Sequence, residues 1–198
     1  MTPGMRQALT VVLIILGIWF DETLRPVGQP PGVLAPEPPR ITPAADKAPI
    51  FEREGHVLTA LAGFEGKARV LSVERYGRDR LARVAPLDLA LGWGRLSDTT
   101  TFRGVDVAQT ERRVVFKSWD PKLPDAEVAA SVINLHVIAA DAEVEKQLNK
   151  LRTGNIVELR GWLVEAVSGD GWRSKGEARA LAPEMPGTLL WVQRIEAS

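Results

Sequence analysis

Residues 156–167 read IVELRGWLVEAV, and this stretch decides the fold that the sequence predicts. A run rich in aliphatic and β-branched residues is typical of a strand. The run is too long to stay flat in a small sheet, and Gly161 stands near its middle, where a barrel strand bends. Residues 168–171, SGDG, follow as a tight hairpin turn that leads to Trp172. The stretch therefore predicts a long, bent strand that ends in a hairpin.

Other segments of the chain have the apolar or β-branched pattern of short strands and are bounded by Gly, Pro or Asp. They span 56–76, which reads as two short strands around a turn at 63–66, and then 85–94, 112–119, 131–138 and 188–195. Within 85–94, alternate positions carry Leu87, Leu89 and Leu91, which places the leucines on one face. This arrangement predicts a mostly β (α+β) fold, namely a small OB-like antiparallel barrel.

One helix is predicted within the barrel domain, at about 142–152. Asp141 is suited to cap its amino terminus, and Gly154 stands where a carboxyl-terminal cap is needed. Apolar residues recur at helical spacing at Val144, Leu148 and Leu151. Because this apolar stripe is narrow, we expect the helix to pack on the sheet along one edge of the helix only. It is expected to cover one end of the barrel.

Residues 8–20, ALTVVLIILGIWF, form an uncharged run of thirteen residues near the amino terminus. A helix over this run spans only ~20 Å, less than the ~30 Å hydrocarbon core, as in a signal sequence. Arg6 precedes the run and Asp21 follows it, so the amino terminus is expected in the cytoplasm. No small-residue cleavage site follows at once, which favours an uncleaved signal anchor at 1–22 as a transmembrane helix. Cleavage further on and a buried helix are the alternatives.

Eight of the fourteen prolines fall between Pro26 and Pro49. Such a stretch favours polyproline II, and about 25 residues at ~3.1 Å each would reach ~75 Å. Residues 23–49 are therefore predicted to be a proline-rich tether, with a ligand for a partner domain as the alternative. Residues 50–198 are left as a single β-rich domain, expected in the periplasm or outside the cell, next to the inner (cytoplasmic) membrane.

Composition narrows the function classes. The chain has 25 basic and 25 acidic side chains, and this neutral balance argues against nucleic-acid binding. The absence of cysteine excludes disulfides and thiol chemistry. His56 and His136 are the only histidines, too few for a histidine-rich metal site. We expect no metal and no cofactor.

Polar residues within the predicted strands are the candidates for chemistry. Asn134 and His136 share one side of a strand and could form a binding or acid/base pair. The alternative is that His136 is a hydrogen-bonded histidine at the sheet edge. Asp88 lies on the face opposite the neighbouring leucines, either as a catalytic carboxylate or as an ordinary solvent-facing residue. A hydrolase-like triad of Asp88, His136 and Ser97 is the enzymatic hypothesis, although no spacing forces the three together.

Tryptophans in loops are the candidates for binding. Trp93 stands between two glycines and Trp172 follows the SGDG turn, where an aromatic face could stack on a sugar or clamp a peptide. Arg173 and Lys175 flank Trp172 and could contact anionic groups. Packing and solvation are the alternative roles of these four residues. Two further tryptophans lie inside predicted strands and are expected in the core or the barrel wall: Trp162 and Trp191.

Two resemblances extend this interpretation. The phrase LRTGNIVELRGWLVEA at 151–166 resembles a segment found in bacterial OB-fold proteins. LAGFEGKARVLSVERY, PLDLALGWGRLSD, INLHVIAAD, LRGWLVEA and GDGWRSK together resemble an uncharacterised family of short, membrane-anchored bacterial envelope proteins. That family has a Cys-Glu pair before its last strand, whereas residues 177–192 here contain no cysteine. The resemblance supports the domain boundaries and implies no activity.

These observations predict a membrane-tethered extracytoplasmic binding or assembly module. Its partners would be the membrane, through residues 8–20, and an unidentified envelope protein or glycan. The alternatives are an envelope hydrolase that uses His136 and Asp88, and a purely structural component. Convergence of Asp88, His136 and a hydroxyl in one concave pocket would favour the enzyme.

Overall fold

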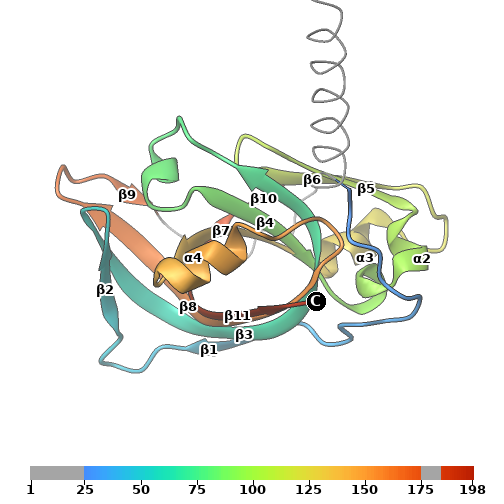
Figure 1. Cartoon of the computed structure of the whole chain (residues 1–198), viewed down its shortest axis with the longest axis horizontal. Helices are drawn as coiled ribbons and strands as arrows, with labels where there is room; N and C mark the ends of the chain where they lie inside the picture. Colours follow the sequence, from blue (N-terminus) through green and yellow to red (C-terminus); the bar gives the residue numbers. More distant parts are fainter. Residues whose placement is uncertain (1–24, 175–183) are drawn as a thin grey trace, which may run out of the picture.

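A computed structural model describes residues 25–174 and 184–198, and in this part the chain is mostly β, as predicted (Figure 1). Five strands form a ring, in which each strand pairs with the next and the last pairs with the first. In ring order they are β3 (His56–Arg75), β4 (Leu87–Gly92), β7 (Val132–Ala139), β11 (Thr188–Ala197) and β8 (Ile156–Ser168).

The ring is not wholly antiparallel, so the prediction of an antiparallel barrel is wrong in one pairing. Strands β7 and β11 run parallel, whereas the other four pairings are antiparallel. The physical reason is the odd number of strands. Directions can alternate all the way round a closed ring only when the number of strands is even, so five strands require at least one parallel pair.

Strand β3 is one continuous strand of twenty residues, not the two short strands predicted at 56–76. Its register shifts against β8 between Ala60 and Ala62, and against β4 between Val70 and Ser72. These bulges curve the strand within the sheet. Gly63 and Gly66 lie inside the continuous strand, so residues 63–66 do not form the predicted turn. The chain thereby covers one side of the ring without interruption.

Further elements extend the ring. β1 (Arg40–Pro43) and β2 (Ile50–Arg53) pair with β3, and β9 (Arg173–Ser174) pairs with β8. A second sheet has the order β10 (Glu184–Pro186), β6 (Arg113–Ser118), β5 (Val105–Thr110), of which the sequence pattern predicted only β6. Short helices occupy the connections: the 3-10 helices η1 (Leu81–Arg83) and η2 (Gly94–Ser97), and the α-helices α2 (Thr99–Phe102) and α3 (Asp125–Ala130).

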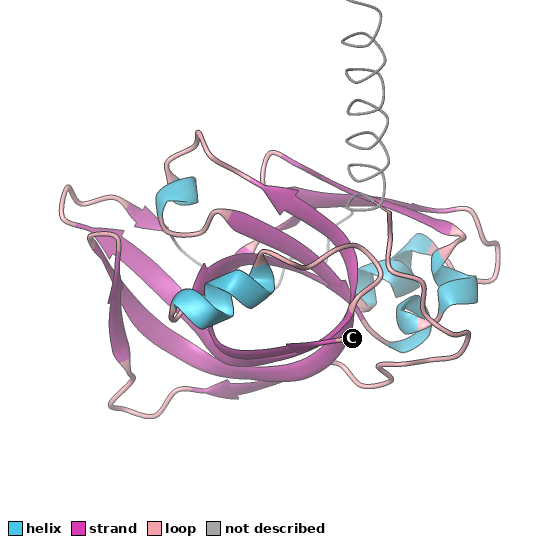
Figure 2. Ribbon diagram, viewed as in Figure 1, coloured by secondary structure: helices cyan, strands magenta, loops and turns pink. Residues whose placement is uncertain are grey.

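The interior of the ring is the main hydrophobic core. It contains fully buried residues such as Phe64, Leu89, Leu135 and Leu190. Helix α4 (Ala142–Leu148) lies across one opening of the ring and adds Val144 and Leu148 to this core (Figure 2). This is the predicted covering helix, although it ends at Leu148, before the predicted residue 152. The Asp141 side chain caps it by accepting a hydrogen bond from the Val144 amide at 2.9 Å, as expected.

Two smaller cores lie outside the ring. One packs Ala90 and Val132, on the outer face of β4 and β7, against Val114 of the second sheet and Val128 of α3. The other contains Trp191, which is buried and stacks on Phe51 with ring centroids 5.0 Å apart. Trp162 packs against this second cluster and is half-buried. Both strand tryptophans therefore contribute to packing, as predicted.

The proline-rich segment lies against the barrel and does not extend away from it. The Val27 amide donates a hydrogen bond to the Thr153 carbonyl at 2.7 Å. Ala35 is fully buried, and β1 pairs with β3 from Arg40 to Pro43. This geometry differs from the free spacer expected at 23–49. We call residues 27–43 the strap; they belong to the folded unit, which begins well before the predicted boundary at residue 50.

Polar side chains of η2 and its carboxyl-terminal flank hold the strap. The Ser97 hydroxyl accepts hydrogen bonds from the Leu34 and Ala35 amides at 3.1 and 3.0 Å. The Asp98 carboxylate accepts one from the Gly32 amide at 2.6 Å and caps α2 through the Thr101 amide at 3.0 Å. These bonds explain how a segment with little secondary structure of its own is fixed in place.

The anchor predicted at residues 8–20 lies outside the described residues. Within 25–174 and 184–198, no helix combines the length and the apolar character needed to cross a bilayer.

The first prediction concerns Asp98 and acid stability. Backbone hydrogen bonds from Gly32 and Thr101 lower the pKa of Asp98 below its ordinary value of 3.8. A carboxyl with a depressed folded-state pKa stabilises the fold above its unfolded pKa, and this contribution is lost as the pH falls through the folded pKa. Asp98→Asn should therefore unfold with a weaker pH dependence than the wild type below about pH 4. Urea melts from pH 7 to pH 2 test this, and parallel curves would contradict it.

The second prediction concerns Gly161, at the middle of β8. A Cβ atom at this position would lie 1.9 Å from the Trp191 carbonyl oxygen, so the neighbouring backbone leaves no room for a side chain. Gly161→Ala should lower the free energy of unfolding by about 3 kcal/mol, because the β8 and β11 backbones must separate. Gly169→Ala is the matched control, since nothing lies within 4 Å of its Cβ position. Equal stabilities of the two variants in chemical denaturation would refute this account.

Candidate functional site

Asp88 and His136 are brought together by the register between β4 and β7. They are direct cross-strand partners on the outer face of the ring, opposite the leucines of β4, as the alternation predicts. Asp88 Oδ1 and His136 Nδ1 are 2.9 Å apart, although their alignment is not that of a hydrogen bond. The contact is therefore ionic when the imidazole is protonated.

Neither residue has the environment that was the non-catalytic alternative in the sequence analysis, namely a sheet edge for His136 and a solvent-facing position for Asp88. His136 lies on β7, which has paired strands on both sides, so it is not at a sheet edge. Asp88 has a fully buried side chain instead of a solvent-facing one. The second sheet and its neighbouring loops cover this part of the outer face, which the pattern of β4 alone could not reveal.

Arg112 completes the cluster and was not among the predicted site residues. It lies in the turn between β5 and β6, and its Nη1 is 2.6 Å from Asp88 Oδ1. Its other guanidinium nitrogens bind the Asp79 carboxylate, with Nη2 donating at 2.9 Å. The guanidinium also stacks on the Tyr76 ring at 3.8 Å. Arg112 thus neutralises a buried carboxylate while it ties the hairpin to the loop that precedes β4.

The backbone at this turn has the geometry of a left-handed hairpin turn. Glu111 and Arg112 have φ angles of 48° and 64°, although neither is glycine. Two-residue hairpin turns of this kind normally use Asn-Gly, because side chains at positive φ are strained. The Arg112 amide donates to the Tyr76 hydroxyl at 3.2 Å, and the Arg112 carbonyl accepts from Asn134 Nδ2 at 2.8 Å. Tertiary contacts therefore hold the turn in place.

Asn134 has a structural role in this arrangement. Its side chain supports the Arg112 carbonyl and accepts a hydrogen bond from Gln109 Nε2 at 3.1 Å. Asn134 is almost fully buried and contacts the hairpin that covers it.

Burial also raises the pKa of Tyr76, so the Tyr76 hydroxyl stays neutral over the physiological range.

The Asp88–His136 pair is buried, with side-chain exposed fractions of 0% and 8%. A Cβ atom at Gly187 would lie 2.2 Å from both Cε1 and Nε2 of His136, so the backbone at Gly187 covers the imidazole. Among the described residues, no hydroxyl group forms a hydrogen bond with His136. Ser97, the predicted third member of a triad, is instead buried with the strap and donates to the Gly94 carbonyl at 2.7 Å. The three residues therefore do not form a catalytic triad.

The predicted loop tryptophans do not form one surface. Trp172 is half-buried, with its ring edge against His56 at 5.7 Å and the Arg80 guanidinium over it at 5.3 Å. Arg80 precedes β4, whereas Trp93 follows the last residue of β4, so the two tryptophans lie at opposite ends of that strand. Arg173 pairs with Glu165 at 3.0 Å, and Lys175 lies outside the described residues.

The most exposed aromatic side chain is one to which sequence reasoning gave no role. Trp119, just after β6, is 67% exposed among the described residues. Its indole nitrogen donates a hydrogen bond to Asp106 Oδ2 at 2.6 Å, which fixes the ring against β5. The sequence signal was the short phrase WDPKLP at 119–124, in which an aromatic residue opens a loop stiffened by two prolines.

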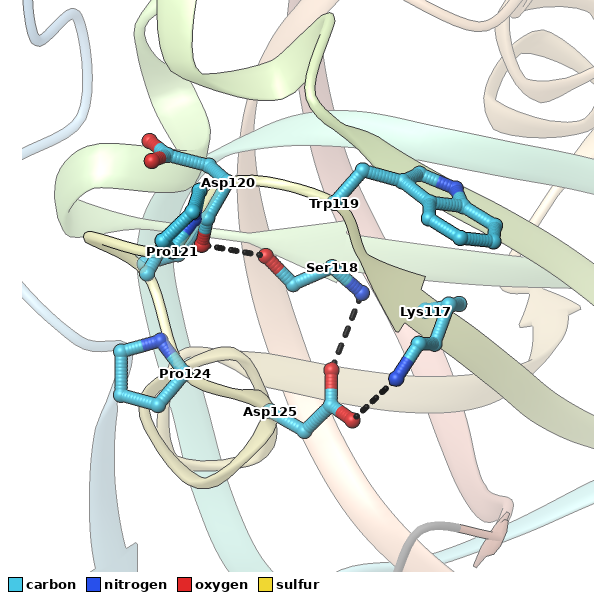
Figure 3. Close-up of a pocket in the computed structure, with 8 residues that line it drawn as sticks. Lys117, Ser118, Trp119, Asp120, Pro121, Pro124 and Asp125 are labelled. Atoms are coloured by element: carbon cyan, nitrogen blue, oxygen red, sulfur yellow. Dashed lines mark hydrogen bonds and ion pairs between the residues drawn. The ribbon is translucent and has the colours of Figure 1, made fainter.

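Beside Trp119 lies a hollow of about 340 Å³, which we call the Trp119 hollow (Figure 3). Asp125 accepts a hydrogen bond from the Ser118 amide at 2.9 Å and lies 3.4 Å from the Lys117 ammonium. The Ser118 amide is the main cause of the lowered pKa of Asp125, so this carboxylate is charged at neutral pH. The hollow is lined by Lys117, Ser118, Trp119, Asp120, Pro121, Leu123, Pro124 and Asp125.

Comparison with known proteins gives no match: no family description, no curated protein and no solved structure matches this chain. Within the described residues, no group of three or more His, Asp or Glu side chains is arranged to hold a metal ion.

The third prediction uses the two carboxylates that share Arg112. The Asp88 side chain is fully buried, whereas that of Asp79 is 40% exposed. Asp88→Ala removes the buried partner of Arg112 and His136 and leaves a void among buried groups, whereas an exposed ion pair contributes little. Asp88→Ala should therefore lower the free energy of unfolding by about 3 kcal/mol, and Asp79→Ala by less than about 1 kcal/mol. Similar losses in urea denaturation would show that burial does not govern this cluster.

Proposed function

We propose that the chain is a membrane-anchored envelope module that binds a partner at the Trp119 hollow. The observation that carries this proposal is the exposed indole of Trp119, which is fixed in orientation by Asp106 next to a concave surface. Large aromatic side chains that stay exposed and ordered are typical of binding surfaces. The membrane contact in this proposal is the run at residues 8–20, with the β domain on the extracytoplasmic side.

An OB-like assignment of the barrel supports a binding role. The ring has five strands, one parallel pair, and helix α4 between its third and fourth strands in chain order. OB folds bind ligands mainly on the face of their second and third strands, which correspond here to β4 and β7. In this chain β5 and β6 of the second sheet are inserted between β4 and β7, and Val114 of β6 packs on that face. We therefore place the partner on the insertion and not on the barrel wall.

The hydrolase alternative has less support. It is favoured by the 2.9 Å contact between Asp88 and His136. The same pair is buried, is neutralised by Arg112, and is separate from Ser97. These features are those of a structural ion pair, because a catalytic pair must reach both a nucleophile and a substrate.

The strap sets the distance between the proposed anchor and the barrel. Six residues separate Phe20 from Val27, whose amide is bonded to the Thr153 carbonyl of the folded unit. Six extended residues span at most about 20 Å, far less than the ~75 Å of a free proline-rich tether. The module is therefore proposed to work close to the membrane surface.

The fourth prediction tests the Trp119 hollow as the binding surface. The full-length chain, displayed in membranes, should capture a partner from envelope extract, and Trp119→Ala should remove most of this capture. Its melting temperature should change little, because an exposed ring contributes little to a core. Ile50→Ala is the matched control, since Ile50 is 66% exposed on β2, in the other sheet.

Two results would contradict the proposal. One is equal capture by the wild type and Trp119→Ala. The other is a loss of capture by Ile50→Ala as large as that by Trp119→Ala, which would indicate nonspecific adhesion. Loss of a hydrolytic activity in His136→Ala, with the fold intact, would favour the enzyme instead.

A further inference from the structure

We propose that the ligand of the Trp119 hollow is a saccharide, with one pyranose ring stacked on the indole and its hydroxyls bound by the polar rim. This inference rests on the proposed function and names the ligand class of the same site. It is carried by the fixed indole, by the polar lining and by the rigidity of the loop.

The indole presents only its apolar face to a ligand. The single polar atom of the ring is already used, because Nε1 donates to Asp106 at 2.6 Å. A pyranose ring has a face of C–H groups that can pack flat on such a surface, whereas its hydroxyls project around the rim. Since Asp106 holds the ring before binding, little side-chain entropy is lost when a ligand stacks on it.

The rim supplies both donors and acceptors, which hydroxyl groups require. The Lys117 ammonium is a donor, and its side chain is 57% exposed. The carboxylate of Asp125 is an acceptor, with an exposed fraction of 48%. A sugar hydroxyl both donates and accepts, so it can bond to either kind of group.

The apolar residues of the lining argue against an aliphatic or aromatic peptide anchor. Leu123 is only 1% exposed, so the hollow lacks an accessible apolar floor that would bury such a side chain. Pro121 and Pro124 are in the loop itself, and their fixed φ angles stiffen the rim. A volume of about 340 Å³ is at the small end of ligand pockets and suits one ring.

The fifth prediction uses three defined probes: chitotriose, maltotriose and a proline decapeptide. They are titrated into the full-length chain in detergent micelles, and binding is followed by NMR. The backbone amide signals of Lys117 and Ser118 report binding in every variant, and the Trp119 indole N–H signal reports it wherever Trp119 is present. At least one of the two sugars should shift this signal saturably, with a Kd on the order of 1 mM or tighter, as for a ligand that engages one ring. Trp119→Ala should weaken sugar binding at least tenfold, and Ile50→Ala should leave it unchanged.

Variants of Asp106 test the fixed orientation of the indole. Asp106→Ala removes the acceptor and should weaken sugar binding several-fold, because the free ring must be ordered on binding. Asp106→Asn keeps a side-chain oxygen that can accept the indole N–H, so it should restore most of the affinity. Trp119→Phe keeps a ring without the N–H and should retain part of the binding, which guards against misfolding of Trp119→Ala.

The outcomes separate this inference from the proposed function. If neither sugar binds, or if only the decapeptide binds, while capture from extract still depends on Trp119, the saccharide inference is wrong and the binding surface stands. If sugar binds equally well to Trp119→Ala, the ligand site lies elsewhere and the inference is again wrong. If capture and sugar binding are both independent of Trp119, both proposals fall.

Discussion

The pairing of β3 with β8 is the contact on which the rest of the structure depends. Without it, the five strands would form an open sheet with two unpaired edges; with it, they enclose a core. Closure requires long strands that curve, which explains the bulges of β3. It also explains the glycine at position 161, because the Trp191 carbonyl approaches the β8 backbone there and leaves no room for a side chain. It also requires one parallel pair, because the number of strands is odd. The parallel pair is β7 and β11, and Gly187, just before β11, lies over His136 of β7.

Much of this fold could be predicted from local pattern. The bent strand at 156–167, the helix after Asp141 and the inward leucines of β4 each follow from residues close together in sequence. The strap could not be predicted in the same way. Its prolines indicate an extended backbone, which is indeed present, but they do not indicate whether that backbone is solvated or packed. Packing depends on Ser97, about sixty residues further along the chain, whose hydroxyl meets two strap amides.

The candidate site likewise combines features that the local sequence predicts with features that depend on distant segments of the chain. Alternation along β4 places Asp88 on the outer face, and this much is correct. The alternation gives no information about which residues pack on that face, because the residues that bury it belong to the β5–β6 hairpin, which follows β4 in the chain. The pairing of Asp88 with His136 depends on the register between β4 and β7, two strands that the insertion separates in the chain. The role of Arg112 depends on a turn in which Glu111 and Arg112 have positive φ angles, although neither is a glycine. Sequence reasoning therefore identified two members of an ion-pair cluster, but it could not identify Arg112 as the third member or the burial of Asp88 and His136.

The insertion between β4 and β7 links the buried cluster to the exposed tryptophan. On the proposed OB-like assignment, it covers the face that such barrels offer to ligands, and Arg112 at its hairpin turn is the residue that fastens it there. The same hairpin carries Asp106 on β5 and leads directly from β6 to Trp119, so the end opposite the Arg112 turn presents the fixed indole. A hairpin held by a buried ion pair at one end can keep an aromatic ring in a constant orientation at the other. The cost of burying Asp88 and of straining Glu111 and Arg112 is then compensated by the rigidity of the surface that we propose for binding.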